Sequence, residues 1–180
     1  MTIQSFIRLA EEKDTDALVR LSSNSFRSAF EKNNKKSDID LYIEENFSRQ
    51  QLRDQLLDPN NVFFLLFIEA QIEAQTSPVG YAKLRMGLSE ECVSTENPIE
   101  IERLYLDASA IGQGLGSTLM QTCLDEASAR GYQSVWLGVW EYNVRAIAFY
   151  KRWGFETVGT HPFQQGTETQ TDWIMQRAIS

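Results

Sequence analysis

The sequence has few of the residues that commonly bind metal ions. Among its 180 residues there are two cysteines, Cys92 and Cys123, and one histidine, His161. The closely spaced set of such ligands that a structural zinc site needs is therefore lacking, and we predict no metal site. Cys123 lies in a helical pattern and is expected in the core. Cys92 and His161 lie in predicted loops and receive no catalytic role.

Long apolar runs and an excess of positive charge are also missing. The longest apolar run covers residues 62–68, well short of the roughly 18 residues that a membrane-spanning helix needs. The first residues lack the basic start and apolar stretch of a signal peptide, so the cytoplasm is the expected location. With 17 Lys and Arg against 25 Asp and Glu, the net charge is −8. This charge argues against nucleic-acid binding and permits attraction of cationic molecules.

Apolar periodicity predicts one domain over residues 1–180, a mixed sheet flanked by helices. Strands are expected over residues 3–9, 62–68, 79–86, 99–106, 135–139, 155–159 and 172–177, with a turn over 71–78. Helices are expected after a cap at Asp14 or Thr15, after capping boxes that pair Ser37 with Asp40 and Ser48 with Gln51, after Asn143, and from Leu115 to Gly131. The alternation of the fourth strand slips between Ile101 and Leu104, which predicts a β-bulge.

The glycine-rich segment Ile111-Gly-Gln-Gly-Leu-Gly-Ser117 lies between a predicted strand and a predicted helix. Glycines let the backbone approach a ligand, and free N–H groups at a helix N-terminus suit a pyrophosphate. A tight turn without a ligand is the alternative. A P-loop would need a lysine after Gly116, and a dinucleotide-binding fingerprint would need a third glycine where Ser117 stands. Gly114 and Gly116 instead match the last two conserved positions of Q/R-x-x-G-x-G/A, a coenzyme A pyrophosphate signature.

A second motif follows downstream, where Asn143-Val-Arg-Ala-Ile-Ala-Phe-Tyr150 matches N-x-x-A-x-x-F-Y. The glycine motif with Gly114 and Gly116 and this second motif occur in the order found in the GNAT superfamily of N-acetyltransferases. The sequence therefore resembles that superfamily. Ile111 departs from that family's usual arginine or glutamine, for which Gln113 can partly substitute. Four further segments resemble bacterial spermine/spermidine N-acetyltransferases: Ile101–Leu106, Trp136–Glu141, Gly159–Phe163 and Thr171–Met175.

The resemblance implies the α/β GNAT fold, a mixed, mostly antiparallel twisted sheet of about seven strands flanked by about four or five helices. The fourth and fifth strands of that fold splay apart. It also implies an enzyme that transfers acetyl from acetyl-CoA directly to a primary amine of a small molecule, with a polyamine favoured. A protein or antibiotic amine, or a coenzyme A sensor without catalysis, are the alternatives. No nucleic-acid or membrane partner is expected, and a homodimer is compatible with the resemblance.

Amine acetylation needs a base, because an alkylammonium has a pKa close to the value of about 10.4 for lysine, and a proton donor for the thiolate. The resemblance implies Tyr150 as the acid. Glu102 is the candidate base, acting through water, because it is a carboxylate beside the predicted bulge. Glu100 and Glu141 are rivals, and a structural carboxylate paired with Arg103 or Arg85 is the alternative for Glu102.

The resemblance also assigns residues to the two substrates. The predicted coenzyme A contacts are Leu104, Tyr105, Leu106, Ile111, Gly112, Gln113, Gly114, Leu115, Gly116, Ser117, Asn143, Tyr150 and Lys151. The backbone N–H of Leu104 would polarise the thioester carbonyl. Asn143 is interpreted either as a contact of the pantetheine arm or as a helix cap, and the two roles are compatible. The predicted acceptor contacts are Phe26, Phe30, Tyr42, Glu102 and Trp140. Each of these aromatic residues can instead belong to the core.

Overall fold

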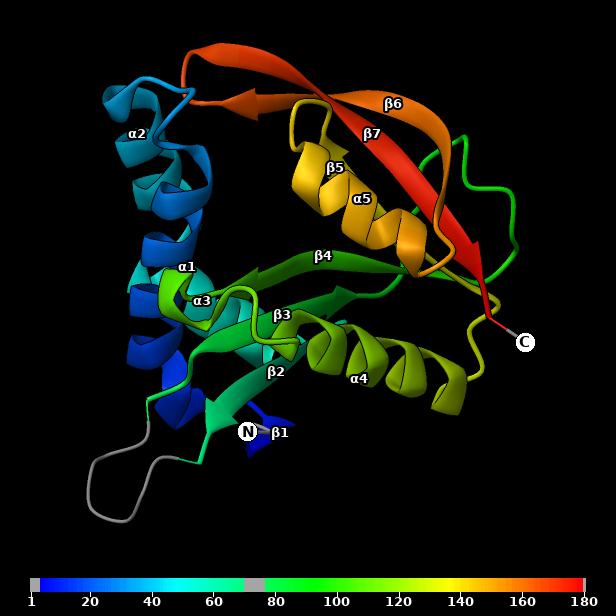
Figure 1. Cartoon of the computed structure of the whole chain (residues 1–180), viewed down its shortest axis with the longest axis horizontal. Coiled ribbons are helices and arrows are strands. Elements are labelled where there is room, and N and C mark those ends of the chain that lie inside the picture. The colour runs from blue at the N-terminus through cyan, green and yellow to red at the C-terminus, as the bar shows by residue number, and fades with distance from the viewer. Residues whose placement is uncertain (1–3, 70–76, 180) are drawn as a thin grey trace.

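The computed structural model describes residues 4–69 and 77–179, so most of the predicted turn at 71–78 lies outside the described residues. Over these two ranges the chain forms seven strands and five α-helices (Figure 1). The strands are β1 (Ser5–Leu9), β2 (Asn61–Ile68), β3 (Gly80–Arg85), β4 (Pro98–Leu106), β5 (Ser134–Trp140), β6 (Glu156–Gln165) and β7 (Glu168–Ala178). The helices are α1 (Thr15–Phe30), α2 (Lys36–Asn46), α3 (Arg49–Leu57), α4 (Leu115–Ala129) and α5 (Val144–Arg152). None of these helices is long and apolar enough to cross a bilayer.

All seven strands join one sheet in the order β1-β2-β3-β4-β5-β7-β6. Neighbouring strands run antiparallel except β4 and β5, which are parallel. The predicted mixed, mostly antiparallel sheet is thus confirmed. β2 lies inside the sheet with helices on both sides, which explains why its residues are apolar on both faces.

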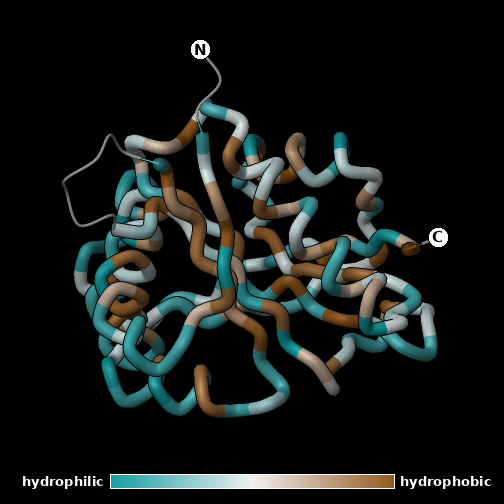
Figure 2. The backbone as a smooth tube through the Cα atoms, turned by 90° about the horizontal axis from the view of Figure 1, so that it is seen from below, coloured by the Kyte–Doolittle hydropathy of each residue, from teal (hydrophilic) through white to brown (hydrophobic). Residues whose placement is uncertain are grey.

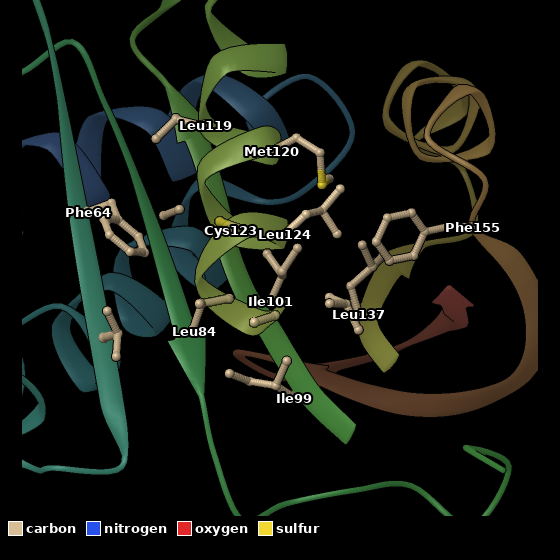
Figure 3. Packing of buried hydrophobic residues seen from close by; sticks show 14 of the residues in the cluster. Phe64, Leu84, Ile99, Ile101, Leu119, Met120, Cys123, Leu124, Leu137 and Phe155 are labelled. Carbon is tan, nitrogen blue, oxygen red and sulfur yellow. The ribbon is translucent and has the colours of Figure 1, made fainter. Parts of the chain in front are cut away.

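Helices cover both faces of the sheet. On one face, Met120, Cys123 and Leu124 of α4 pack toward Ile101 and Leu137 of the central strands (Figure 3). On the other face, α1, α2 and α3 bury a second apolar cluster against β2 and β3. Hydrophobic residues accordingly concentrate along the central strands (Figure 2). Each fully buried leucine in these layers contributes about 2 kcal/mol, so packing on the sheet fixes the helices.

Two of the predicted helix caps form as expected. The Ser48 hydroxyl accepts a hydrogen bond from the Gln51 N–H at 3.3 Å and starts α3. The Asn143 side-chain oxygen accepts one from the Ala146 N–H at 3.1 Å and starts α5. These bonds satisfy N–H groups that a helix leaves free in its first turn.

The predicted capping box at Ser37 is wrong. α2 begins one residue earlier, at Lys36, and the residue preceding it makes no side-chain cap. Asp40, the expected partner in the box, pairs instead with Arg27 at 2.7 Å and with Lys36 at 2.5 Å. The Asp40 carboxylate therefore forms surface ion pairs and does not bond to the backbone N–H of the predicted cap residue.

The last two strands extend well beyond the predicted segments 155–159 and 172–177. β6 and β7 form one long hairpin, paired from Glu156↔Gln176 to Gln165↔Glu168. The added residues are largely Thr and Gln, which suit a strand but give no apolar alternation. Pro162 is accommodated because β6 is an edge strand of the sheet.

Candidate functional site

β4 and β5 separate after a short parallel contact. They pair over three residues, from Pro98↔Ser134 to Glu100↔Trp136. Beyond that point β4 stays on β3 and β5 stays on β7, so within the described chain the facing edges of β4 and β5 have no strand partner. The predicted splay of the fourth and fifth strands is confirmed. An extended, amide-containing ligand can bond to such edges as a strand would.

The predicted bulge lies beside this opening. Arg103 pairs with Lys83 and Ile101 pairs with Leu84, so Glu102 is the extra residue of β4. A bulge of this kind turns the strand and re-aims the groups around it. It bends β4 where β5 is no longer paired with it.

The glycine-rich segment follows β4 and leads into α4. Gly112 and Gly114 have φ values of 86° and 81°, in the left-handed region that favours glycine. Within the described chain, the backbone N–H groups of residues 112–116 donate no hydrogen bond to another backbone group. The N-terminus of α4 adds its partial positive charge at Leu115. A row of free N–H donors at a helix start fits a pyrophosphate.

Side chains of the same loop contribute less. Ile111 is exposed, and the Gln113 amide donates to the Ser109 carbonyl at 2.7 Å. The Gln113 side chain therefore braces the loop from within. Leu115 is buried in the core, whereas Ser117 is exposed on the first turn of α4.

Of the other predicted coenzyme A contacts, Leu104, Tyr105 and Leu106 lie on the unpaired edge of β4. Asn143 caps α5, as described above. The exposed Lys151 places its Nζ 5.8 Å from the centre of the Trp173 ring, at the end of α5. A Cβ on Gly116 would lie 3.8 Å from both Leu106 of β4 and Phe149 of α5, so the glycine-rich loop meets β4 and α5.

Tyr150 is half-buried on α5. Its ring packs edge-on against Phe149 and Phe155, with centroids 5.5 and 5.9 Å apart. Burial raises the pKa of the Tyr150 phenol to about 12. The phenol therefore carries its proton at neutral pH and can act as a donor.

Glu102 lies within a cluster of positive charge. Its carboxylate is 2.5 Å from Lys83 Nζ, 3.2 Å from Arg103 Nη2 and 3.5 Å from Arg85 Nε. Gln55 Oε1 accepts from both Lys83 Nζ and Arg103 Nη1, at 3.0 and 3.1 Å. Burial disfavours the charged carboxylate, but the three cations together hold the pKa of Glu102 below its usual range. These contacts match the paired structural carboxylate, the alternative that the sequence left open.

The rival carboxylates have different surroundings. Glu100 is buried and accepts a 2.7 Å hydrogen bond from Arg85 Nε, while burial raises its pKa. Glu141 follows β5 and is half-exposed. Glu100 is thus held by Arg85 of β3, and Glu141 is partly open to solvent.

The predicted acceptor aromatics form one cluster. Tyr42 stacks on Phe26 with centroids 4.4 Å apart, and Trp140 lies 5.9 Å from Phe30. Phe26 and Phe30 are 2% and 8% exposed, so they support Tyr42 and Trp140 from the core side. Phe163 of β6, which the sequence analysis missed, lies 5.5 Å from Tyr42. We call Tyr42, Trp140 and Phe163 the aromatic wall.

A second group was also missed, and it lies on the same face of the sheet. Asp172 of β7 is 9% exposed and pairs in register with Trp140 and with His161. His161 Nε2 is 3.9 Å from Asp172 Oδ2, and His161 Nδ1 is 3.0 Å from Glu90 Oε1. The one available signal was an acid within an otherwise apolar strand, Asp172-Trp-Ile-Met. Within the described ranges, no three His, Cys, Asp or Glu side chains are placed to hold a metal ion.

The splayed strands and the row of free N–H groups define a coenzyme A-dependent acyltransferase. The sequence profile of the acetyltransferase (GNAT) family matches residues 21–155. The chain therefore belongs to this family, and its acyl donor is acetyl-CoA. An uncharacterized N-acetyltransferase of Lactobacillus delbrueckii subsp. lactis is 29% identical over 168 residues, covering 93% of this chain and 94% of that protein.

Solved structures share the fold. The PaiA N-acetyltransferase of Thermoplasma acidophilum in complex with coenzyme A superposes with a TM-score of 0.77 at 19% identity, covering 98% of this chain and 99% of that one. The ribosomal-protein-S18-alanine N-acetyltransferase of Escherichia coli gives 0.68 at 19% identity, covering 98% and 95%. These likenesses concern the fold and leave the acceptor of this enzyme open.

Proposed function

We propose that this enzyme transfers acetyl from acetyl-CoA directly to a primary amine of a small molecule, with a polyamine as the leading acceptor. The observation that carries the proposal is the opening between β4 and β5. It borders the glycine-rich loop at one end and faces the aromatic wall and Asp172 on the acceptor side. Donor and acceptor can therefore meet where β4 bulges.

The donor half of the proposal rests on backbone groups. The free N–H groups of residues 112–116 would hold the pyrophosphate, and the unpaired β4 edge at Leu104–Leu106 would bond the pantetheine arm. When bound, acetyl-CoA supplies an activated acyl group. The N–H of Leu104 would polarise the acyl carbonyl. The protonated phenol of Tyr150 would supply the proton that the thiol needs.

Direct transfer is favoured over a covalent acetyl-enzyme. Cys123 is fully buried in the core, and burial raises the pKa of its thiol to about 12. A buried thiol of this kind is a poor nucleophile at neutral pH. Cys92 lies in the loop before β4, where it packs against Val93 and Trp136.

The acceptor half rests on shape and charge. The aromatic wall offers apolar surface for an alkyl chain, and Glu90, Glu141 and Asp172 place negative charge on the same side. A net charge of −8 attracts cations from solution. A flexible chain with several ammonium groups fits both properties.

The test measures thiol release from acetyl-CoA with a panel of acceptors. Spermidine, spermine and putrescine represent polyamines, an alanine-initiated peptide represents protein N-termini, and kanamycin represents antibiotic amines. We expect turnover with the polyamines and little with the other two. Turnover only with the peptide or kanamycin overturns the polyamine assignment. Stabilisation by acetyl-CoA without turnover on any amine favours a sensor.

A further inference from the structure

We propose that the Asp172 carboxylate accepts the proton that the acceptor ammonium loses, and that His161 and Glu90 carry this proton to solvent. The assignment rests on the proposed function and names the base of that reaction. It differs from the base that the sequence suggested, Glu102.

The strand pairing places Asp172 close, along the sheet, to the position where the Leu104 N–H would bind the acyl carbonyl. The last paired residues across the opening are Glu100 and Trp136. Beyond this pair the two strands splay apart, and Glu102 is the extra residue of the β4 bulge, so counting along both strands brings Leu104 near the level of Val139, next to Trp140. Trp140 pairs directly with Asp172 on the neighbouring strand. The acid therefore lies one strand away from the position where the Leu104 N–H would hold the acyl carbonyl.

A glycine keeps the carboxylate accessible. Gly138 is exposed although the rest of β5 is largely buried. A Cβ at this position would lie 3.4 Å from Asp172 Oδ2 and 3.5 Å from His161 Nε2. Any longer side chain at Gly138 would cover both groups from the side of the opening. The missing side chain leaves room for an amine beside Asp172.

The carboxylate itself is incompletely bonded. Asp172 Oδ1 is buried and makes no hydrogen bond in the described part of the chain. A buried carboxylate oxygen without a partner is costly, so such atoms commonly await a ligand or water. The other carboxylate oxygen, Oδ2, lies beside Gly138, and an ammonium group that enters there would donate a hydrogen bond to it.

The histidine links the buried acid to the surface. His161 Nδ1 lies 3.0 Å from the half-exposed Glu90 carboxylate. A proton on Nδ1 donates to Glu90 and leaves Nε2 as an acceptor toward Asp172 Oδ2, 3.9 Å away. Catalytic hydrogen bonds are often this long before substrate binds. The order Asp172, His161, Glu90 thus runs from the buried face to solvent.

Asp172 also differs from Glu102 in its electrostatics. Burial raises the pKa of Asp172 to about 6, against the attraction of His161. Three cations hold the pKa of Glu102 low, which makes its carboxylate a weaker proton acceptor. A base works best with a pKa near the working pH. The titratable groups facing Asp172 are His161 of β6 with its partner Glu90, Glu141 after β5, and the Tyr42 phenol of α2.

The proton balance of the reaction is complete with these groups. The ammonium gives one proton to Asp172, and the neutral amine forms the C–N bond to the acyl carbon. The C–S bond breaks, and its electron pair stays on sulfur, which takes a proton from Tyr150. The second nitrogen proton, lost as the amide forms, restores the phenol. Asp172 passes its proton to His161 Nε2, and the Nδ1 proton leaves through Glu90.

The test compares wild type, Asp172→Asn and the exposed control Glu91→Gln, using the best amine of the acceptor panel. Asp172→Asn should lower kcat about 10²-fold, with the KM for acetyl-CoA unchanged. It should also abolish the acidic limb of the pH profile of kcat. Activity should recover with an alkylamine bearing electron-withdrawing fluorines, which is already neutral at the assay pH. His161→Gln should lower kcat less, because Asp172 remains.

Each other outcome has a defined meaning. A kcat for Asp172→Asn equal to wild type overturns the base assignment alone. So does a loss that appears only in the KM for the amine, or one that the fluorinated amine does not relieve. Stabilisation of Asp172→Asn by acetyl-CoA shows that the variant is folded. Absence of amine acetylation by wild type overturns the proposed function and the base assignment together.

Discussion

Asp38 of α2 accepts two hydrogen bonds from Thr167 at the tip of the β6–β7 hairpin, one from its N–H and one from its hydroxyl, both 2.9 Å long. Lys35 and Glu168 add an ion pair of 2.8 Å beside them. A Cβ on Gly166 would lie 2.6 Å from Asp38, so the turn can approach only because it has no side chain there. These contacts join the tip of the hairpin, shown in orange and red in Figure 1, to α2 on the side of the proposed acceptor site.

Cutting this contact should weaken amine binding. Asp38→Ala removes both hydrogen bonds to Thr167, so the hairpin tip should open more often. We expect a several-fold higher KM for the amine, a smaller change in kcat, and faster hydrogen exchange at the Thr167 N–H. Asp40→Ala, on the same helix, removes only surface ion pairs and should leave all three unchanged. Equal effects of the two variants would contradict a role for the hairpin contact.

Removing the Tyr150 hydroxyl should impair chemistry more than donor binding. Tyr150→Phe keeps the ring contacts with Phe149 and Phe155 but deletes the proton donor. We expect kcat to fall about 10²-fold while the Kd for acetyl-CoA changes little. Steady-state kinetics and calorimetric titration measure the two quantities. Tyr142→Phe, at a 69% exposed position, is the control and should behave as wild type; a loss of acetyl-CoA affinity in Tyr150→Phe equal to its loss of kcat would count against the acid role.

A side chain at Gly114 should disturb the donor loop. Gly114→Ala must hold φ near 81°, which costs about 1–2 kcal/mol in an L-residue. Gly87→Ala is a matched control, because Gly87 has a φ of 78° and, like Gly114, no atom within 4 Å of its added Cβ. Both variants should lose similar thermal stability in the absence of ligand. Only Gly114→Ala should lose affinity for acetyl-CoA, and an equal loss in Gly87→Ala would show that strain alone is responsible.

Asp172 should cost stability at neutral pH. Its folded pKa of about 6 lies above the ordinary value of 3.8, so the folded state binds more protons between these values. The carboxyl group therefore favours folding at low pH, and that contribution is lost as the pH rises through about 6. Asp172→Asn should be more stable than wild type at pH 7, by up to about 3 kcal/mol, with a gap that closes toward pH 4. Urea unfolding at several pH values measures the gap; a gap independent of pH would contradict the assignment.

Much of the fold could be predicted from periodicity and turn chemistry. Ser48 and Asn143 mark helix starts by a local bond that needs no tertiary contact, and both predictions are confirmed. The bulge could be located between Ile101 and Leu104 because the alternation of apolar and polar residues is visible within a single strand. The capping box at Ser37 does not form, because its expected partner Asp40 pairs with Arg27 of α1 and with Lys36 of α2. The predicted lengths of β6 and β7 were too short, because backbone pairing between the two strands continues through polar residues that show no apolar alternation.

The candidate site was less predictable, because its polar groups depend on long-range pairing. The glycine-rich loop is local, so its residues could be named in advance. Glu102 could be placed beside the bulge, but the cations that surround it come partly from β3. His161 showed no partner in the sequence, because Glu90 and Asp172 reach it only through the loop before β4 and through β7. Such partners become visible only when the strand order is known.

The short contact between β4 and β5 also bears on the order in which substrates add. The β4 edge of the opening presents backbone groups that a bound donor would satisfy, and the acceptor side of the proposed site depends on the same two strands. The donor would act as a missing strand and fix the distance between β4 and β5. The acceptor would then enter a finished site, so acetyl-CoA should bind first and coenzyme A should leave last. In initial-rate studies this order predicts intersecting lines, and coenzyme A should compete with acetyl-CoA but not with the amine.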